Sequence, residues 1–187
     1  MKFCFWGNVS SALNGKTRGG AELQIALLAK SLAMKGHNVV VIDPYVKESF
    51  TTNEGIRVIN IPDWNKGIRV IRFFFRRIPL LYRLFKAQNA DFYYVRMKTY
   101  LHIIPYLACR KVNGKFIIGI AHDLDLANFR DRYKYAYSNK FNLLRFITRN
   151  LPNDWVFDYL VKKADYLLVQ HAGQKSNAQN AKGHVAV

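Results

Sequence analysis

Short apolar runs alternate along the chain with longer stretches in which apolar residues recur at helical spacing. A continuous apolar run is typical of a strand covered on both faces, and helical periodicity indicates a helix packed on a sheet. The expected strands are 2–6, 38–42, 57–61, 91–95, 115–121, 165–169 and 184–187. The expected helices are 19–35, 65–88, 100–111, 131–149, 154–163 and 172–181. This order predicts a Rossmann-like α/β fold, a doubly wound, mostly parallel sheet with helices on both faces.

Glycine and proline mark several of the expected boundaries. Gly36 follows the helix 19–35 at the position where a left-handed residue commonly ends a helix. Pro152 is expected to begin the helix 154–163, and Pro79 and Pro105 to kink the helices that contain them, because proline lacks a backbone N–H. The apolar side expected for the helix 19–35 consists of Leu23, Ala26, Leu27, the aliphatic stem of Lys30, Leu32 and Ala33.

Composition narrows the class of protein. The chain has 187 residues, of which 50% are hydrophobic, so it is expected to bury one core as a single domain, residues 1–187. Its formal net charge of +17 predicts an acidic partner: a phospholipid surface, nucleic acid or a phosphorylated substrate. Cys4 and Cys109 lie in apolar runs and are expected to be buried, reduced thiols. No membrane-spanning run, signal peptide or metal-ligand spacing is recognisable, so a cytoplasmic protein without a metal site is expected.

Ligands of doubly wound sheets bind outside the carboxyl ends of the strands, here the loops 7–20, 96–99 and 122–125. In the first loop, Gly19 and Gly20 precede a helix and let a ligand anion approach its unpaired N–H groups; the alternative is a tight strand-to-helix turn.

Gly15-Lys16-Thr17 matches the end of a Walker A motif, which would indicate a nucleotide hydrolase. Ser10 stands where that motif needs glycine, and Arg18-Gly19-Gly20 precede the helix, so a hydrolase is not expected.

Two other strand ends carry candidate polar groups. His122-Asp123-Leu124-Asp125 follows the strand 115–121 directly, where a histidine can donate hydrogen bonds or handle protons in a cleft. The alternative is an aspartate that caps a helix beside a solvated histidine. Arg96 ends the strand 91–95 and is either a partner for a ligand phosphate or a solvated charge.

The helix 65–88 combines basic and aromatic residues in the sequence NKGIRVIRFFFRRIPLLYRLFKAQ. On a helical wheel, most of its basic residues lie opposite Ile71, Phe74, Ile78, Leu81 and Phe85. This pattern predicts association with an anionic membrane surface. The residues expected to face that membrane are Arg69, Arg72, Phe74, Arg76 and Arg77. The alternative is an ordinary helix packed on the sheet with solvated arginines. Residues 129–149 repeat the mixture of basic and aromatic residues. No RNA-binding signature is present, so a nucleic-acid partner is not expected.

The stretch GGAELQIALLAKSLAMKGH, set between two apolar strands, resembles the start of retaining glycosyltransferases of family four, which have the two-domain GT-B architecture. The resemblance runs from Phe3 to the last strand. It implies an N-terminal, acceptor-binding domain whose enzyme moves a sugar from a nucleotide-diphosphate donor to a glycan or lipid-linked acceptor. It also implies that no metal and no separate cofactor is required.

The resemblance also suggests roles for the candidate residues. Gly19 and Gly20 would lie near the donor phosphates, and Lys16 or Arg18 would add positive charge. His122 would hydrogen-bond or handle a proton at the sugar or acceptor, with Asp123 as its catalytic neighbour. Further members of the implied site are Asp125, for hydroxyl groups or ring orientation, and Arg96, for a phosphate of the acceptor. The family has a small polar residue where Gln170-His171 stand, so His171 is expected to be a surface or capping histidine and not a member of the site.

The two-domain resemblance implies that most donor contacts lie in a C-terminal domain. We expect that domain to be absent after Val187 and the chain alone to be nearly inactive. The expected location is cytoplasmic, peripheral on the inner face of the membrane. The alternative function is a non-catalytic, basic module that binds membrane surfaces.

Overall fold

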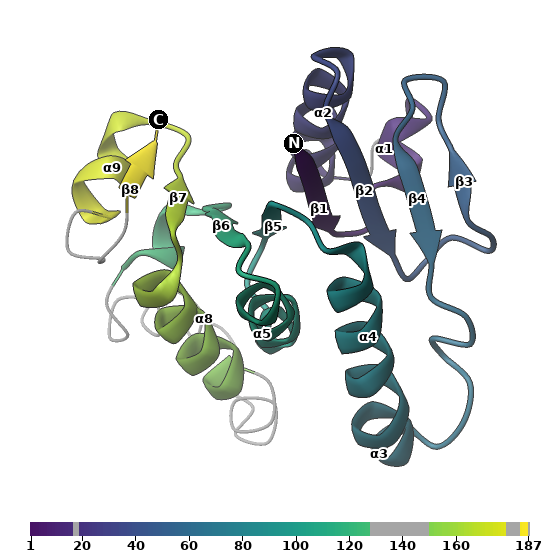
Figure 1. Cartoon of the computed structure of the whole chain (residues 1–187). Coiled ribbons are helices and arrows are strands. Elements are labelled where there is room, and N and C mark those ends of the chain that lie inside the picture. The colour runs from purple at the N-terminus through teal and green to yellow at the C-terminus, as the bar shows by residue number, and fades with distance from the viewer. Residues whose placement is uncertain (17–18, 128–149, 179–183, 187) are drawn as a thin grey trace. The chain divides into compact units, whose positions relative to one another are not determined.

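The computed structural model describes residues 1–16, 19–127, 150–178 and 184–186. Strands and helices alternate along these residues, which confirms the predicted α/β class (Figure 1). Contacts divide the chain into two compact units. The first consists of Met1–Val95 with Ile104–Phe116, and the second of Arg96–Ile103 with Ile117–Val187.

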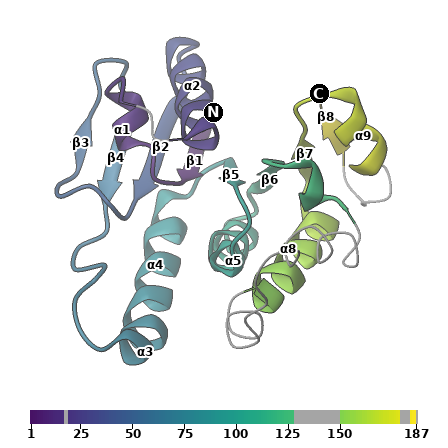
Figure 2. The same ribbon diagram turned by 180° about the vertical axis from the view of Figure 1, so that it is seen from behind.

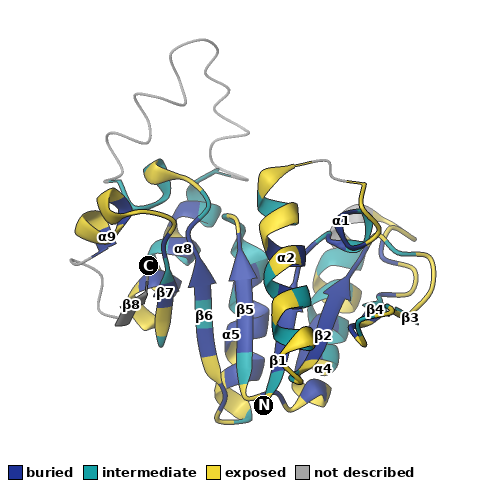
Figure 3. Ribbon diagram, turned by 90° about the horizontal axis from the view of Figure 1, so that it is seen from above, coloured by how far each residue is buried: buried dark blue, intermediate teal, exposed yellow. Residues whose placement is uncertain are grey.

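The first unit is built on a sheet with the strand order β3-β4-β2-β1-β5. Its parallel strands are β1 (Lys2–Trp6), β2 (Asn38–Asp43), β4 (Arg57–Asn60) and β5 (Phe92–Arg96). The short strand β3 (Phe50–Thr51), which the sequence pattern did not predict, pairs antiparallel with β4 at the edge. Phe3 is opposite Val39 on one side and Phe92 on the other. The centre of this sheet is buried, as the continuous apolar runs predicted (Figure 3).

Helices cover both faces of the first sheet (Figures 1 and 2). On one face lie α1 (Ser10–Leu13) and α2 (Gly20–Met34), and on the other α4 (Ile78–Gln88) and α5 (Ile103–Lys111). Gly36 has a φ of 79°, which confirms the left-handed residue predicted after α2. The helix expected over 100–111 changes from 3-10 turns to the α-helix α5 at Ile103, so Pro105 lies in the first turn of α5.

The apolar side predicted for α2 is only partly correct, because Ala26 is buried but two of the predicted leucines are exposed. Ile25, Ala26 and Ala29 are the buried residues of this helix, whereas Leu23 and Leu27 are 37% and 56% exposed. Two of the three buried residues are alanines, which let the helix backbone lie close to the strands. Hydrophobicity alone favoured the leucines and missed the importance of side-chain size.

The helix predicted over 65–88 consists of three consecutive segments: α3 (Arg69–Arg72), the π-helix η1 (Phe73–Arg77) and α4. A π-turn contains more residues than an α-turn, so the side chains after it are rotated relative to a regular helix. Leu81 and Phe85 are buried at 1% exposure each, whereas Ile71 and Phe74 are 55% and 58% exposed. The predicted apolar side is therefore divided at η1, directly before Pro79.

The second unit contains most of β6 (Lys115–Gly119), from Ile117 on, and the strands β7 (Tyr166–Leu168) and β8 (His184–Ala186), which follow it in the sheet in parallel. Its described helices are the 3-10 helices η2 (Tyr100–His102) and η3 (Asp123–Asp125), and the α-helices α8 (Leu151–Lys163) and α9 (Ala172–Ala178). Pro152 lies in the first turn of α8, as predicted. The helix expected over 131–149 lies outside the described residues.

Cys4 and Cys109 are buried and free, which confirms the two buried thiols. Within the described residues, no helix is both long enough and apolar enough to cross a membrane.

Candidate functional site

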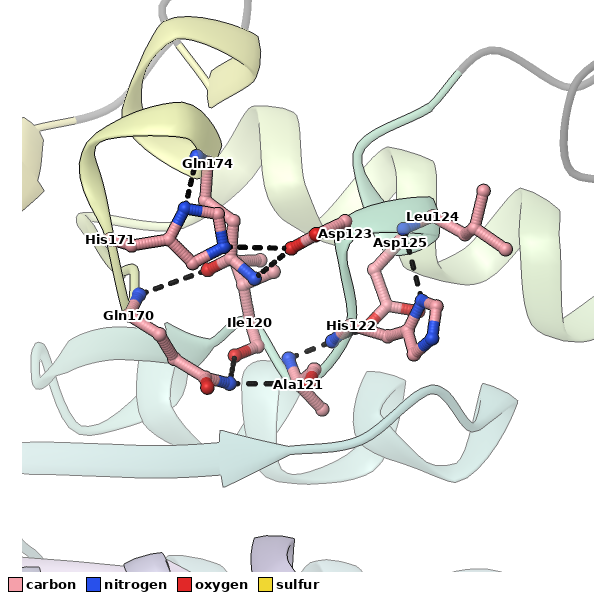
Figure 4. Close-up of polar contacts among 9 residues, drawn as sticks. All are labelled: Ile120, Ala121, His122, Asp123, Leu124, Asp125, Gln170, His171 and Gln174. Carbon is pink, nitrogen blue, oxygen red and sulfur yellow. Dashed lines mark hydrogen bonds and ion pairs between the residues drawn. The ribbon is translucent and has the colours of Figure 1, made fainter.

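The polar groups that follow β6 and β7 form one connected cluster (Figure 4). These strands pair in parallel with Ile118 opposite Leu167, and the N–H of Ile120 donates to the carbonyl oxygen of Leu168 at 2.9 Å. Both strands therefore end at one level. That pairing brings the turn after β6 against the turn between β7 and α9.

His122 is itself the N-cap of η3, so the predicted alternative of an aspartate cap is wrong. Its Nδ1 accepts a hydrogen bond from the N–H of Leu124 at 3.2 Å. Asp125 completes the box, because its Oδ2 accepts from the N–H groups of His122 at 3.0 Å and Ala121 at 3.3 Å. The Asp125 carboxylate thus holds the turn that presents His122.

The cap determines which nitrogen of His122 carries a proton. Because Nδ1 accepts from Leu124, the neutral ring has its proton on Nε2. His122 is exposed, and Figure 4 shows its ring turned away from Asp123. In this tautomer Nε2 donates a hydrogen bond. The arrangement suits donation to an oxygen of a ligand better than abstraction of a proton.

Asp123 is held at a single oxygen. Its Oδ1 accepts from Nε2 of Gln174 at 2.7 Å and from Nε2 of His171 at 2.9 Å. Within the described residues Oδ2 makes no hydrogen bond, and 64% of the side chain is exposed. The bonds from Gln174 and then His171 lower the pKa of Asp123, so the carboxylate is ionised at neutral pH and Oδ2 is available as an acceptor.

The turn between β7 and α9 supplies these donors. Gln174 accepts from the N–H of Gln170 through Oε1 at 2.9 Å, and its own N–H donates to Nδ1 of His171 at 3.3 Å. Gln170 donates through Nε2 to the carbonyl oxygens of Ile120 at 2.9 Å and Ala121 at 3.2 Å. The surface or capping histidine expected at His171 is confirmed, because His171 is exposed and accepts from the N–H of Gln174. Its bond to Asp123 was not expected, and Gln174 was not singled out. The usable signal was that consecutive parallel strands can be neighbours, so that their following loops meet.

The loop before α2 contains the glycine pair. Gly19 is the extended N-cap residue of α2, and both Gly19 and Gly20 are exposed. A Cβ at either position would meet no atom of the described residues within 4 Å, and neither has a positive φ. Packing within the described chain therefore does not explain the pair. Lys16 is exposed in the same loop, and Arg18 lies outside the described residues.

The Walker A alternative does not fit this loop. Gly15 and Lys16 follow the short helix α1, and α2 begins only at Gly20, so Lys16 does not open a helix as the motif requires. Asp43, at the end of β2, accepts through Oδ2 from the N–H groups of Val9 and Ser10, both at 3.0 Å. This buried carboxylate anchors the start of α1.

Arg96 ends β5 and is only 4% exposed, so the predicted alternative of a solvated charge is wrong. The residues after it are tied to α8: Lys98 forms an ion pair with Asp154, and the N–H of Tyr100 donates to Oδ1 of Asn153 at 2.8 Å. The loop 96–99, predicted as a ligand-binding loop, is thus fastened at its far end to the start of this helix.

The basic residues near η1 contact the loop that precedes α3. Arg72 donates to the carbonyl oxygen of Asn65, and Arg76 pairs with Asp63 at 2.6 Å. The guanidinium of Arg77 lies 4.2 Å from the ring centroid of Trp64. The side chain of Arg69 lies outside the described residues.

Four large apolar residues on the same helical segments and just before them are exposed to solvent. We call these residues the aromatic edge: Ile68, Ile71, Phe74 and Phe75. Their exposed fractions are 71%, 55%, 58% and 81%, respectively. The predicted membrane surface therefore presents aromatic and aliphatic groups, beside arginines that are partly engaged within the first unit.

The strands, the crossover helices and the polar turn at their carboxyl ends define a Rossmann-like α/β domain of the kind found in GT-B glycosyltransferases. The family model described as Glycosyltransferase Family 4 matches residues 18–169, which include the glycine pair and the turn after β6. The chain belongs to this family. No curated protein matches it at a significant level.

Proposed function

We propose that the chain is the acceptor-binding half of a retaining glycosyltransferase. Membership of Glycosyltransferase Family 4 supports sugar transfer as the type of reaction. The observation that carries the acceptor role is the turn after β6, where an outward Nε2–H of His122 and an ionised Asp123 follow each other. A hydroxyl-rich ligand is bound through both donors and acceptors, and this turn carries one of each.

In this proposal, Oδ2 of Asp123 accepts a hydrogen bond from the acceptor hydroxyl. His122 donates to an oxygen of the transferred sugar. Transfer forms a bond between the acceptor oxygen and the anomeric carbon and breaks the bond from that carbon to the diphosphate. The proton of the acceptor hydroxyl passes to the departing diphosphate, which leaves as a nucleoside diphosphate. Hydrogen bonds aimed at groups whose charge changes during the reaction are an effective source of catalysis.

The donor diphosphate is assigned to Gly19 and Gly20. Their exposed backbone opens the 15-residue helix α2, whose N-terminal N–H groups and dipole favour an anion. Lys16 and Arg18 would add charge from the same loop. The remaining donor contacts are assigned to a second domain, as the resemblance to two-domain transferases implies.

The acceptor is proposed to be membrane-bound or lipid-linked, with the protein peripheral on the inner face of the membrane. Support comes from the net charge of +17 and from the aromatic edge. Rings at the headgroup boundary and cations near anionic lipid act together in interfacial helices.

Release of nucleoside diphosphate from a panel of UDP-, GDP- and ADP-sugars tests the proposed function. The assay uses the full gene product with a lipid extract of its own cells as the acceptor source. His122→Asn is the informative variant, because asparagine keeps an N-cap acceptor for the N–H of Leu124 but lacks the Nε2 donor. We expect release to fall about 10- to 100-fold with an unchanged thermal unfolding midpoint.

Glu48→Gln, at an exposed residue of the first unit, is the control and should leave release unchanged. Absence of release with every donor would contradict a transferase, and vesicle binding without release would favour the non-catalytic module. Unchanged release in His122→Asn would remove His122 from the site.

A further inference from the structure

We propose that His171 and Gln174 are positioning residues for sugar transfer. They hold the Asp123 carboxylate by Oδ1 so that Oδ2 is presented to the acceptor hydroxyl. This inference rests on the proposed function, and it extends that function to two residues of the turn between β7 and α9. Figure 4 shows both side chains reaching Asp123 from α9 and the residue before it.

The amide of Gln174 has a fixed orientation. Gln174 is only 2% exposed, and its Oε1 accepts from the N–H of Gln170 while its Nε2 donates to Asp123. Rotating the amide by half a turn would place its NH2 group against an N–H and its oxygen against a carboxylate. The structure therefore favours a single orientation, the one that donates to Asp123.

The tautomer of His171 is likewise the one that donates a hydrogen bond to Asp123. Its Nδ1 accepts from the N–H of Gln174 at 3.3 Å, so the neutral ring carries its proton on Nε2, which lies 2.9 Å from Oδ1 of Asp123. The ring needs no positive charge to make this bond. Both donors to Asp123 are thus oriented by the start of α9 itself.

The support for Asp123 extends to the strand that precedes His122. Gln170 binds the carbonyl oxygens of Ile120 and Ala121, so the turn after β7 is tied to the end of β6. At the start of α9, the N–H of Gln174 is already satisfied by Nδ1 of His171. The bonds that Gln174 and His171 make to Asp123 are additional to this cap, and water could solvate the exposed carboxylate without them.

Gln174→Glu tests the proposal in the nucleoside diphosphate assay. Glutamate keeps an oxygen for the N–H of Gln170 but places its second oxygen against Oδ1 of Asp123, so two carboxylates repel each other. At pH 7.5 we expect kcat to fall about 10- to 100-fold with KM for the nucleotide sugar unchanged. Activity should recover partly towards pH 5, because a shared proton restores the bond; His171 and His122 are the other titratable groups that act on Asp123.

Lys175→Met, at an exposed residue of α9, is the matched control and should keep the parental kcat and pH profile. An unchanged kcat and pH profile in Gln174→Glu would overturn the positioning role. Long-range proton–nitrogen spectra of the His171 ring test the geometry independently of activity, and a predominant Nδ1–H tautomer would also overturn it. If the parent itself releases no nucleoside diphosphate, the proposed function fails, whereas the spectra still decide whether Asp123 is held as described.

Discussion

At the scale of single residues, buried charges and buried histidines are the most sensitive positions. Asp43 is fully buried and accepts three backbone N–H groups, from Val9, Ser10 and Tyr45. A carboxylate in this position is stabilised by the donors that it satisfies. The donors in turn depend on it, because the N–H of Val9 is buried and Asp43 is the acceptor that satisfies it.

We predict that Asp43→Asn destabilises the protein by about 2–3 kcal/mol, because an amide NH2 group replaces an acceptor oxygen that serves two N–H groups. Urea unfolding followed by circular dichroism measures the change. Glu48→Gln, which neutralises an exposed acid, should shift the free energy of unfolding by less than about 0.5 kcal/mol. An equal effect of the two substitutions would contradict the anchoring role of Asp43.

His102 makes stability depend on pH. It is 1% exposed, and burial lowers its pKa from 6.5 to about 3. The unfolded chain therefore binds a proton between these values that the folded chain excludes, and stability is lost as pH falls through this range. The contribution of His102 should decrease by about 2 kcal/mol between pH 7.5 and 5.0.

Comparison with His102→Leu isolates this effect from all other titrating groups. The free energy of unfolding of the variant should fall less steeply on acidification over the same range. Parallel pH profiles of parent and variant would show that His102 is not buried in its neutral form.

At the scale of elements, arginines of the helical segment before Pro79 attach it to the loop that precedes α3. Arg77 lies over the ring of Trp64, donates through Nε to its carbonyl oxygen at 2.9 Å, and donates through Nη2 to Oδ1 of Asn65 at 2.9 Å. The exposed pair of Arg76 with Asp63 is expected to contribute less, because water screens it.

Arg77→Lys should therefore lower the free energy of unfolding by about 1–2 kcal/mol, because lysine cannot stack as a plane or donate in two directions. Arg76→Lys is the matched control and should cost at most about 0.5 kcal/mol. Thermal or urea unfolding compares the two, and a larger loss for Arg76→Lys would reverse the assignment.

The aromatic edge gives a second prediction at this scale. Phe75 is 81% exposed, so Phe75→Ser should leave the free energy of unfolding nearly unchanged. If the ring enters the headgroup boundary, its loss should weaken binding to phosphatidylcholine vesicles with about one-third phosphatidylserine by roughly 10-fold. Met34→Ser, at the 80% exposed end of α2, is the matched control in a flotation assay. Equal binding of the two variants would argue against a membrane role for the aromatic edge.

At the scale of the whole molecule, charge and apolar exposure predict two components of membrane binding. The net charge of +17 attracts anionic lipid from a distance and is screened by salt, whereas insertion of rings is not. Raising the salt concentration should therefore remove most of the vesicle binding and leave a remainder that depends on Phe75. Binding that vanishes completely in high salt would indicate electrostatic adsorption alone.

The fold class followed from the sequence because buried parallel strands are continuous apolar runs, as in β1 and β2, and this pattern is independent of detailed packing. The buried side of α2 did not follow, because contact with the sheet selected Ala26 and Ala29 by size. The division of the helix at η1 did not follow either, because a local change from α-helical to π-helical turns is not visible in a pattern that assumes one constant helical period.

The candidate site was predictable in its position but only partly in its members. A polar group after an apolar strand is visible in the sequence, which identified His122 and Asp123. Gln174 reaches Asp123 only because the pairing of β6 with β7 brings together two turns that are far apart in the chain, and its hydrogen bonds were therefore not visible.

The π-helix η1 has an evolutionary consequence, because a π-turn in an α-helix is equivalent to the insertion of a single residue. Relatives that lack or gain one residue at this point would turn the aromatic edge about the helix axis while Leu81 and Phe85 keep their places in the core. A change of one residue in gene length at this site would thus re-aim that surface without a change to the fold.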